Sequence, residues 1–64
     1  MKAGETKIYK TEKTDRYFLQ FNNNKVILLE PYLGDCNPEN FRWEVRDTKS
    51  GIRFYAKLSE LKDK

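Results

Sequence analysis

The chain has 64 residues and carries 13 basic and 10 acidic side chains, for a formal net charge of +3. A chain of this length forms one small domain that buries only about 60% of its unfolded surface, so nearly every large apolar residue is needed for the core and little is left for a deep pocket. One cysteine and no histidine exclude an intramolecular disulfide framework, a cysteine-based zinc cluster and the commonest general base.

The sequence contains no segment of the kind that targets or anchors a protein. The longest aliphatic run, residues 26–29, is far too short for a signal peptide or a membrane span. We therefore expect a cytoplasmic protein with no membrane contact. Residues 1–64 are expected to form a single small β-barrel domain, as a monomer or a weak homodimer.

The first half of the chain predicts three strands. A turn at residues 2–5 leads into a strand at residues 6–10 with Ile8 as its inward residue, and the charged residues 11–16 form a surface loop. Residues 17–21 and 25–32 form the next two strands. Asparagine tolerates positive φ, so Asn23 and Asn24 are expected to form a type I′ hairpin turn between them.

This hairpin is predicted to have apolar residues on both faces. Its core face consists of Leu19, Phe21, Val26 and Leu28. Its other face consists of Phe18, Gln20, Ile27 and Leu29. A strand that is apolar on both sides is either covered by other parts of the chain or part of a contact surface. We expect covering by the chain itself, because small barrels bend one long strand through both halves of the core.

The loop at residues 33–40 is longer than a hairpin needs and contains the single cysteine, Cys36. The negative charge of Asp35 beside it disfavours the reactive thiolate, so Cys36 is expected to be an incidental loop thiol. Asp35 and Glu39 lack the interleaved oxygen ligands of a calcium loop, so no metal site is predicted.

Residues 41–58 predict a second hairpin, whose two faces follow from the alternation of apolar and polar side chains. A four-residue loop, residues 48–51, fixes the register, with Gly51 in the left-handed conformation. This register places Asp47 opposite Ile52. The apolar cross-strand pairs are then Val45 with Phe54 and Trp43 with Ala56, with Phe41 on the same face.

The other face of this hairpin is basic. Its cross-strand pairs are Arg46 with Arg53, Glu44 with Tyr55 and Arg42 with Lys57. Two pairs of like charges are mildly destabilising, which favours a face kept for a negatively charged partner. Charged outer faces also serve solubility and protect sheet edges, so this simpler interpretation stays open.

After the hairpin, a short turn of helix is expected to close the barrel. Ser59 would cap a single helical or 3₁₀ turn that runs to Leu61, with Leu58 and Leu61 covering the end of the core. Residues 62–64 are expected to fray.

Five short strands, a charged loop after the first, a tight hairpin near the end and a terminal one-turn helix resemble the SH3-like small barrels, including the KOW and Tudor-like groups. The segments that carry the resemblance are residues 2–5, 43–54 and 58–61. The resemblance implies an all-β fold, a five-stranded SH3-like small barrel with a C-terminal 3₁₀ or one-turn helix. An OB-like barrel is the alternative fold.

The resemblance is to a fold and carries no ligand-binding signature with it. The sequence has neither the aromatic cage of Tudor domains nor the paired tyrosines and ALYDY-like run of true SH3 domains. Small barrels of this kind are common as ribosomal or transcription-associated modules and as small phage or mobile-element proteins. The three glycines are too dispersed for a phosphate-binding loop, so we expect a protein that is not an enzyme and uses no cofactor.

Two classes of function fit the sequence. The first is nucleic-acid binding through the basic face, where arginine and lysine would contact phosphates and a tyrosine would stack on a base or sugar. The candidate binding residues are Arg42, Arg46, Arg53, Tyr55 and Lys57. The second is a protein-binding regulator or inhibitor, for example phage-encoded. It would use the same face against an acidic protein surface, or an apolar patch of Phe18, Ile27 and Leu29 together with Tyr32 and the loop at residues 33–40.

Overall fold

The computed structural model describes residues 2–33 and 41–63. These residues form an all-β fold in which five antiparallel strands make one sheet in the order β4-β3-β2-β1-β5. The strands are β1 (Thr6–Tyr9), β2 (Lys25–Leu33), β3 (Phe41–Asp47), β4 (Arg53–Lys57) and β5 (Leu61–Lys62). A four-residue helix, α1 (Arg16–Leu19), follows β1, and a 3₁₀ turn (Leu58–Glu60) joins β4 to β5.

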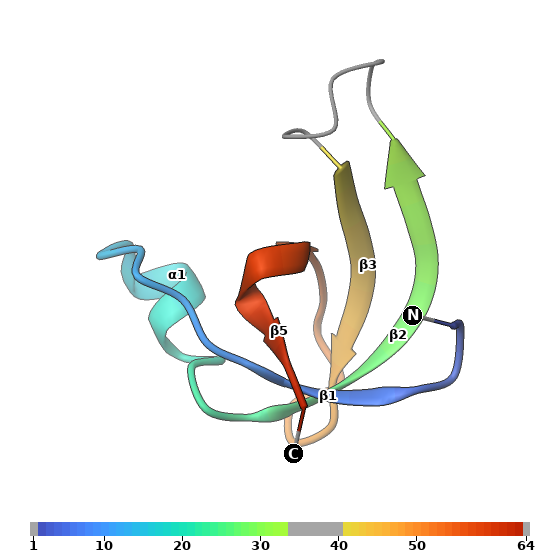
Figure 1. Cartoon of the computed structure of the whole chain (residues 1–64). Helices are drawn as coiled ribbons and strands as arrows, with labels where there is room; N and C mark the ends of the chain where they lie inside the picture. Colours follow the sequence, from blue (N-terminus) through green and yellow to red (C-terminus); the bar gives the residue numbers. More distant parts are fainter. Residues whose placement is uncertain (1, 34–40, 64) are drawn as a thin grey trace.

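The sheet is strongly curved, so one long strand takes part in both halves of the barrel-like fold. The start of β2 pairs with β1, and its whole length pairs with β3. Figure 1 shows β2 and β3 bending side by side while β1 crosses near the start of β2. The predicted all-β small barrel with a C-terminal 3₁₀ turn is confirmed at this level.

The core fills the concave side of the sheet. Its buried side chains are Tyr9, Phe21, Val26, Leu28, Trp43, Val45, Phe54, Ala56 and Leu61. Phe54 has three aromatic neighbours: the Phe21 ring stacks on it with centroids 4.2 Å apart, and the Tyr9 and Phe18 rings meet it edge-on. Stacked and edge-to-face pairs of this kind add stability beyond the apolar area that they bury.

The C-terminal hairpin has the predicted register. Val45 pairs with Phe54 and Trp43 with Ala56, and the three outer pairs also match the prediction. Gly51 has a φ of 76°, the left-handed conformation that the loop requires. Ile52 is the exception on the apolar face, because its side chain is exposed at the end of the turn.

Asp47 holds this turn together from a buried position. Its carboxylate accepts hydrogen bonds from the Ser50 N–H (3.0 Å), the Ser50 hydroxyl (2.7 Å) and the Asn24 amide (3.2 Å). Burial, the largest influence, raises the pKa of Asp47, but these hydrogen bonds together bring it below its ordinary value. The turn is therefore tied to the residue that precedes β2.

The prediction of a strand at residues 17–21 is wrong. This segment begins with α1, whose N-cap Asp15 accepts a hydrogen bond from the Tyr17 N–H at 2.9 Å. A helical turn places Phe18 and Phe21 on the same side, where both rings reach Phe54, whereas a strand would point them to opposite faces. Packing against the core therefore prevails over the strand propensity of the aromatic residues.

The asparagine turn differs accordingly. Asn23 alone has a positive φ, 69°, and its N–H donates to the Tyr9 carbonyl at 2.7 Å. The segment therefore bonds to the end of β1 and does not form a hairpin. Leu19, predicted to be inward, is exposed, and in β1 the buried residue is Tyr9 whereas Ile8 is only partly buried.

The C-terminal turn begins two residues earlier than predicted. Its N-cap is Lys57, and Ser59 lies inside the turn. Leu61 is buried as expected, but Leu58 is exposed. The chain then forms β5, which pairs with β1 through Ile8–Lys62 and Tyr9–Leu61. Two residues are too few to show strand alternation, so only the neighbouring β1 reveals this strand.

The loop predicted at residues 33–40 lies outside the described residues, apart from the end of β2, and so does Cys36.

Within the described ranges, neither α1 nor the 3₁₀ turn has the length and apolar character that a membrane-crossing helix needs.

Trp43 lies in the core, only 6% exposed, so its fluorescence should be blue-shifted in the native protein. Trp43→Ala should cost about 3 to 5 kcal/mol of unfolding free energy, a large part of the total for so small a domain. Chemical denaturation measures this cost. Ile52→Ala, an exposed apolar position on the same hairpin, should change stability by less than about 0.5 kcal/mol. Native emission typical of solvated tryptophan would contradict the core assignment.

Gly51→Val should destabilise the hairpin turn. A Cβ at this position would meet nothing within 4 Å, so the cost comes from the positive φ alone and is about 1 to 3 kcal/mol. Gly51→Asn is the matched control, because asparagine tolerates this conformation and should lose much less. Equal thermal midpoints for the two variants would show that backbone strain does not matter here.

Candidate nucleic-acid interface

The convex side of β2, β3 and β4 forms one surface, which we call the outer face. Its cross-strand rows are Ile27, Arg46 and Arg53; then Glu30, Glu44 and Tyr55; then Tyr32, Arg42 and Lys57. All five candidate binding residues from the sequence lie on this surface. The strand alternation explains this, because the residues between them point into the core.

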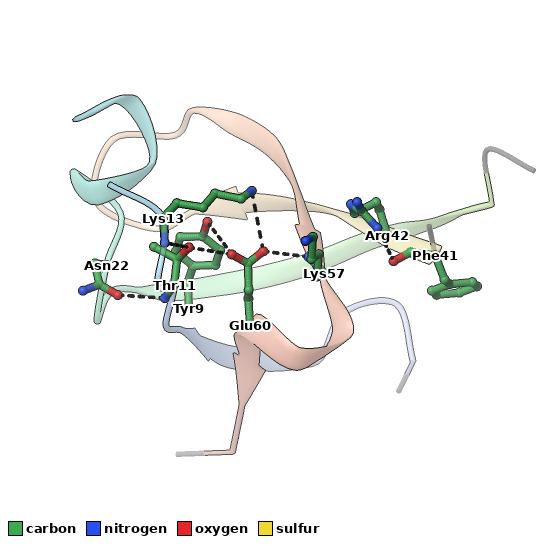
Figure 2. A network of polar contacts seen from close by, with 8 residues as sticks. All are labelled: Tyr9, Thr11, Lys13, Asn22, Phe41, Arg42, Lys57 and Glu60. Carbon is green, nitrogen blue, oxygen red and sulfur yellow. Dashed lines mark hydrogen bonds and ion pairs between the residues drawn. The ribbon is translucent and has the colours of Figure 1, made fainter. Parts of the chain in front are cut away.

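The basic residues of the outer face differ in exposure. Arg46, Arg53 and Lys57 are exposed, whereas Arg42 is partly buried. The Arg42 guanidinium donates a hydrogen bond to the Phe41 carbonyl at 3.2 Å, as Figure 2 shows. Three of the four cations therefore extend into solvent, and the fourth is held against the sheet.

Two tyrosines form an exposed aromatic pair on the outer face. The rings of Tyr32 on β2 and Tyr55 on β4 meet across β3 with centroids 5.2 Å apart and an interplanar angle of 44°. Tyr32 is 51% exposed and Tyr55 49%. Half-exposed rings in contact offer a preformed surface for another flat group, and the basic side chains of Arg42 and Lys57 flank them.

The sequence predicted Tyr55 as a binding residue but missed Tyr32 as its neighbour. Regular alternation from Val26 and Leu28, which are buried, would point Tyr32 into the core. The register shifts between Leu28 and Glu30, and after this β-bulge the residues of β2 exchange the two faces of the sheet. The sequence signal that could have indicated the bulge is Pro31, because proline cannot donate to a sheet ladder and within sheets it is found at edge strands, strand starts or bulges.

The bulge also brings an acidic residue to the middle of the outer face. Glu30 pairs with Glu44, so a row containing two carboxylates separates the two basic rows. With four basic and two acidic residues, the outer face carries a charge of +2 rather than the +3 expected from the hairpin alone. The positive charge of the outer face is therefore concentrated at its two ends, and its middle row is acidic.

The alternative apolar patch does not form a single surface. Phe18 packs on the core through Phe54, and the Lys13 ammonium lies 3.9 Å from the centre of its ring. Ile27 lies on the outer face beside Arg46, because its neighbours Val26 and Leu28 point inward. The patch predicted from Phe18, Ile27 and Leu29 is therefore not brought together.

A second basic surface adjoins the outer face. Residues 10–13, which follow β1, and residues at the end of β4 and in the C-terminal turn enclose a cleft of about 650 Å³. We call it the lysine cleft, since its walls include Lys10, Lys13, Lys57 and Lys62. The sequence predicts only a surface loop at residues 11–16. Nothing in the chain order predicts that this loop and the C-terminal turn face each other.

Glu60 forms the floor of the lysine cleft and is only 6% exposed. Its carboxylate accepts hydrogen bonds from the Thr11 hydroxyl (2.5 Å), the Lys57 N–H (2.9 Å) and the Tyr9 hydroxyl (3.4 Å). The Lys13 ammonium lies 3.8 Å away. Figure 2 shows these groups around the carboxylate, which joins the end of β1 to the C-terminal turn.

This environment favours the charged form of Glu60. Burial is the largest single influence and raises the pKa of Glu60. The hydrogen bonds from Thr11 and the Lys57 backbone, together with the charges of Lys13 and Lys57, outweigh burial and hold the pKa below its ordinary value of 4.5. Glu60 is thus a buried anion whose carboxylate oxygens are hydrogen-bonded within the fold.

Among residues 2–33 and 41–63, no cluster of three or more histidine, cysteine, aspartate or glutamate side chains could hold a metal ion.

Comparison of the chain with protein-family models, with curated proteins and with solved structures finds no match.

Glu60→Gln should lower the free energy of unfolding at neutral pH and make that free energy less dependent on pH in the acid range. Because the folded-state pKa of Glu60 is depressed, the unfolded chain binds more protons, so this contribution is present above pH 4.5 and is lost as the pH falls below that value. Denaturation between pH 7 and pH 3 measures the effect. Glu12→Gln, an exposed position in the same cleft, is the control and should follow the wild-type curve. Parallel curves for wild type and Glu60→Gln would contradict the assignment.

Proposed function

We propose that this chain is an SH3-like small barrel that binds nucleic acid through its outer face and is not an enzyme. The observation that carries the proposal is the pair of half-exposed tyrosines, Tyr32 and Tyr55, in contact at 5.2 Å between cationic side chains. Aromatic platforms beside positive charges are how proteins bind nucleic acids without strong sequence preference, since every base has a π-face.

The distribution of charge supports the same partner. Arg46 and Arg53 form one basic end of the outer face, and Arg42 and Lys57 form the other. The ends lie four residues apart along β3, or about 13 Å at the usual rise of a strand. Such a spacing lets phosphates bind on both sides of the tyrosine pair while a base rests on the rings.

The acidic row has a role in this arrangement. The carboxylates of Glu30 and Glu44 lie in the row of Tyr55, where a base rather than a phosphate would bind. A carboxylate accepts hydrogen bonds from exocyclic amino groups of bases, as glutamate and aspartate do with cytosine. The mixed charge of the outer face therefore fits a ligand with alternating anionic and hydrogen-bond-donating parts.

Binding should be measured by NMR titration with a mixed-sequence oligonucleotide at several salt concentrations. We expect affinity to fall steeply with salt, with roughly three to four phosphate contacts. Replacing Arg46 and Arg53 together by glutamate should abolish binding. The fold should survive, because both side chains are exposed and one like-charge pair replaces another.

Tyrosine variants test the stacking step separately. Tyr32→Ala and Tyr55→Ala should each lose about 1 to 3 kcal/mol of binding free energy if a base stacks on the pair. Tyr17→Ala is the matched control, because Tyr17 on α1 is 48% exposed but lies away from the outer face. Absence of chemical-shift changes at low salt would refute nucleic-acid binding and leave the protein-binding regulator, for which an acidic peptide is the next probe.

A further inference from the structure

Positive charge is concentrated on two adjoining surfaces. The outer face and the lysine cleft together contain seven basic and four acidic residues. The rest of the described chain contains five basic and four acidic residues, so these two surfaces carry most of its positive charge. A polyanion is therefore attracted to both of them.

Lys57 belongs to both surfaces and connects them. It pairs with Arg42 at the last row of the outer face, and it also lines the cleft. At this residue β4 ends and the chain enters the 3₁₀ turn, whose Glu60 accepts the Lys57 N–H. Figure 2 shows Lys57 between Glu60 and Arg42. The basic surface thus continues around the end of an edge strand.

The cleft offers cations that the fold does not use. Lys13 is engaged by Glu60 and by the Phe18 ring. Lys10 and Lys62, by contrast, have no ion-pair partner among the described residues, and both are exposed and line the cleft. Because the acceptors of Glu60 are already satisfied, its charge does not need these two lysines.

We infer that the ligand is a single-stranded nucleic acid whose backbone passes from the tyrosine pair over Lys57 into the lysine cleft, where Lys10 and Lys62 bind its phosphates. This inference rests on the proposed function. A duplex is stiff over about 150 base pairs and does not follow a surface that turns within one small domain, whereas a single strand does. The curved course of the basic surface therefore favours a single strand over a duplex.

The test compares oligothymidines of three and eight nucleotides by fluorescence anisotropy, with a duplex hairpin of equal charge as competitor. Lys10→Gln combined with Lys62→Gln is the cleft variant. Lys2→Gln combined with Lys49→Gln is the control, because it removes the same charge at exposed positions outside both surfaces. Circular dichroism confirms that each variant folds.

The cleft variant should bind the eight-nucleotide strand more weakly but the three-nucleotide strand as tightly as the wild type does. Loss of two phosphate contacts lowers the slope of log affinity against log salt concentration by about 1.4. If the wild type and the cleft variant bind equally at 1 M salt, the wild type should bind roughly 60-fold more tightly at 50 mM. The control variant should keep the wild-type slope, and the duplex should compete poorly.

The experiment distinguishes failure of this inference from failure of the proposed function. Equal slopes for the cleft variant and the control, or a duplex that competes as well as the single strand, would overturn the inference and leave the outer face as the binding site. If the wild type binds neither oligonucleotide, or if glutamate at Arg46 and Arg53 leaves binding unchanged, the proposed function is wrong and the inference falls with it.

Discussion

The stacked rings of Phe21 and Phe54 join the segment after α1 to the edge strand β4, and the curvature of the sheet depends on this contact. A sheet of five short strands has little area to bury unless it bends around its own side chains. Tyr9 meets Phe54 from β1 on the same side, so three parts of the chain converge on one ring. The curvature that results leaves a convex side on which β2, β3 and β4 display their polar residues.

The β-bulge between Leu28 and Glu30 gives this convex side its functional character. A regular strand would bury Tyr32, whereas the bulge exposes it beside Tyr55 and places Glu30 beside Glu44. Bulges often lie next to binding sites because they redirect side chains at little cost to the rest of the sheet. The tyrosine pair and the separation of the two basic ends are both consequences of this one irregularity.

Glu60 connects the fold to the second basic surface. Its carboxylate is buried with hydrogen bonds from Thr11 and the Lys57 backbone, and this holds the loop after β1 against the C-terminal turn. The same contact brings lysines distant in sequence into one cleft. A buried anion that is fully hydrogen-bonded specifies a unique arrangement, because removing one partner leaves an uncompensated charge.

The sequence alone determined the C-terminal hairpin, including its register, the left-handed Gly51 and the burial of Trp43, because alternation and turn chemistry are local properties. It also predicted that Arg42, Arg46, Arg53, Tyr55 and Lys57 share one surface. The helical turn at Phe18, the strand β5, the bulge that exposes Tyr32 and the cleft around Glu60 were decided only by the tertiary structure. Each of them depends on contacts between residues far apart in the chain, which the alternation of apolar and polar residues does not encode.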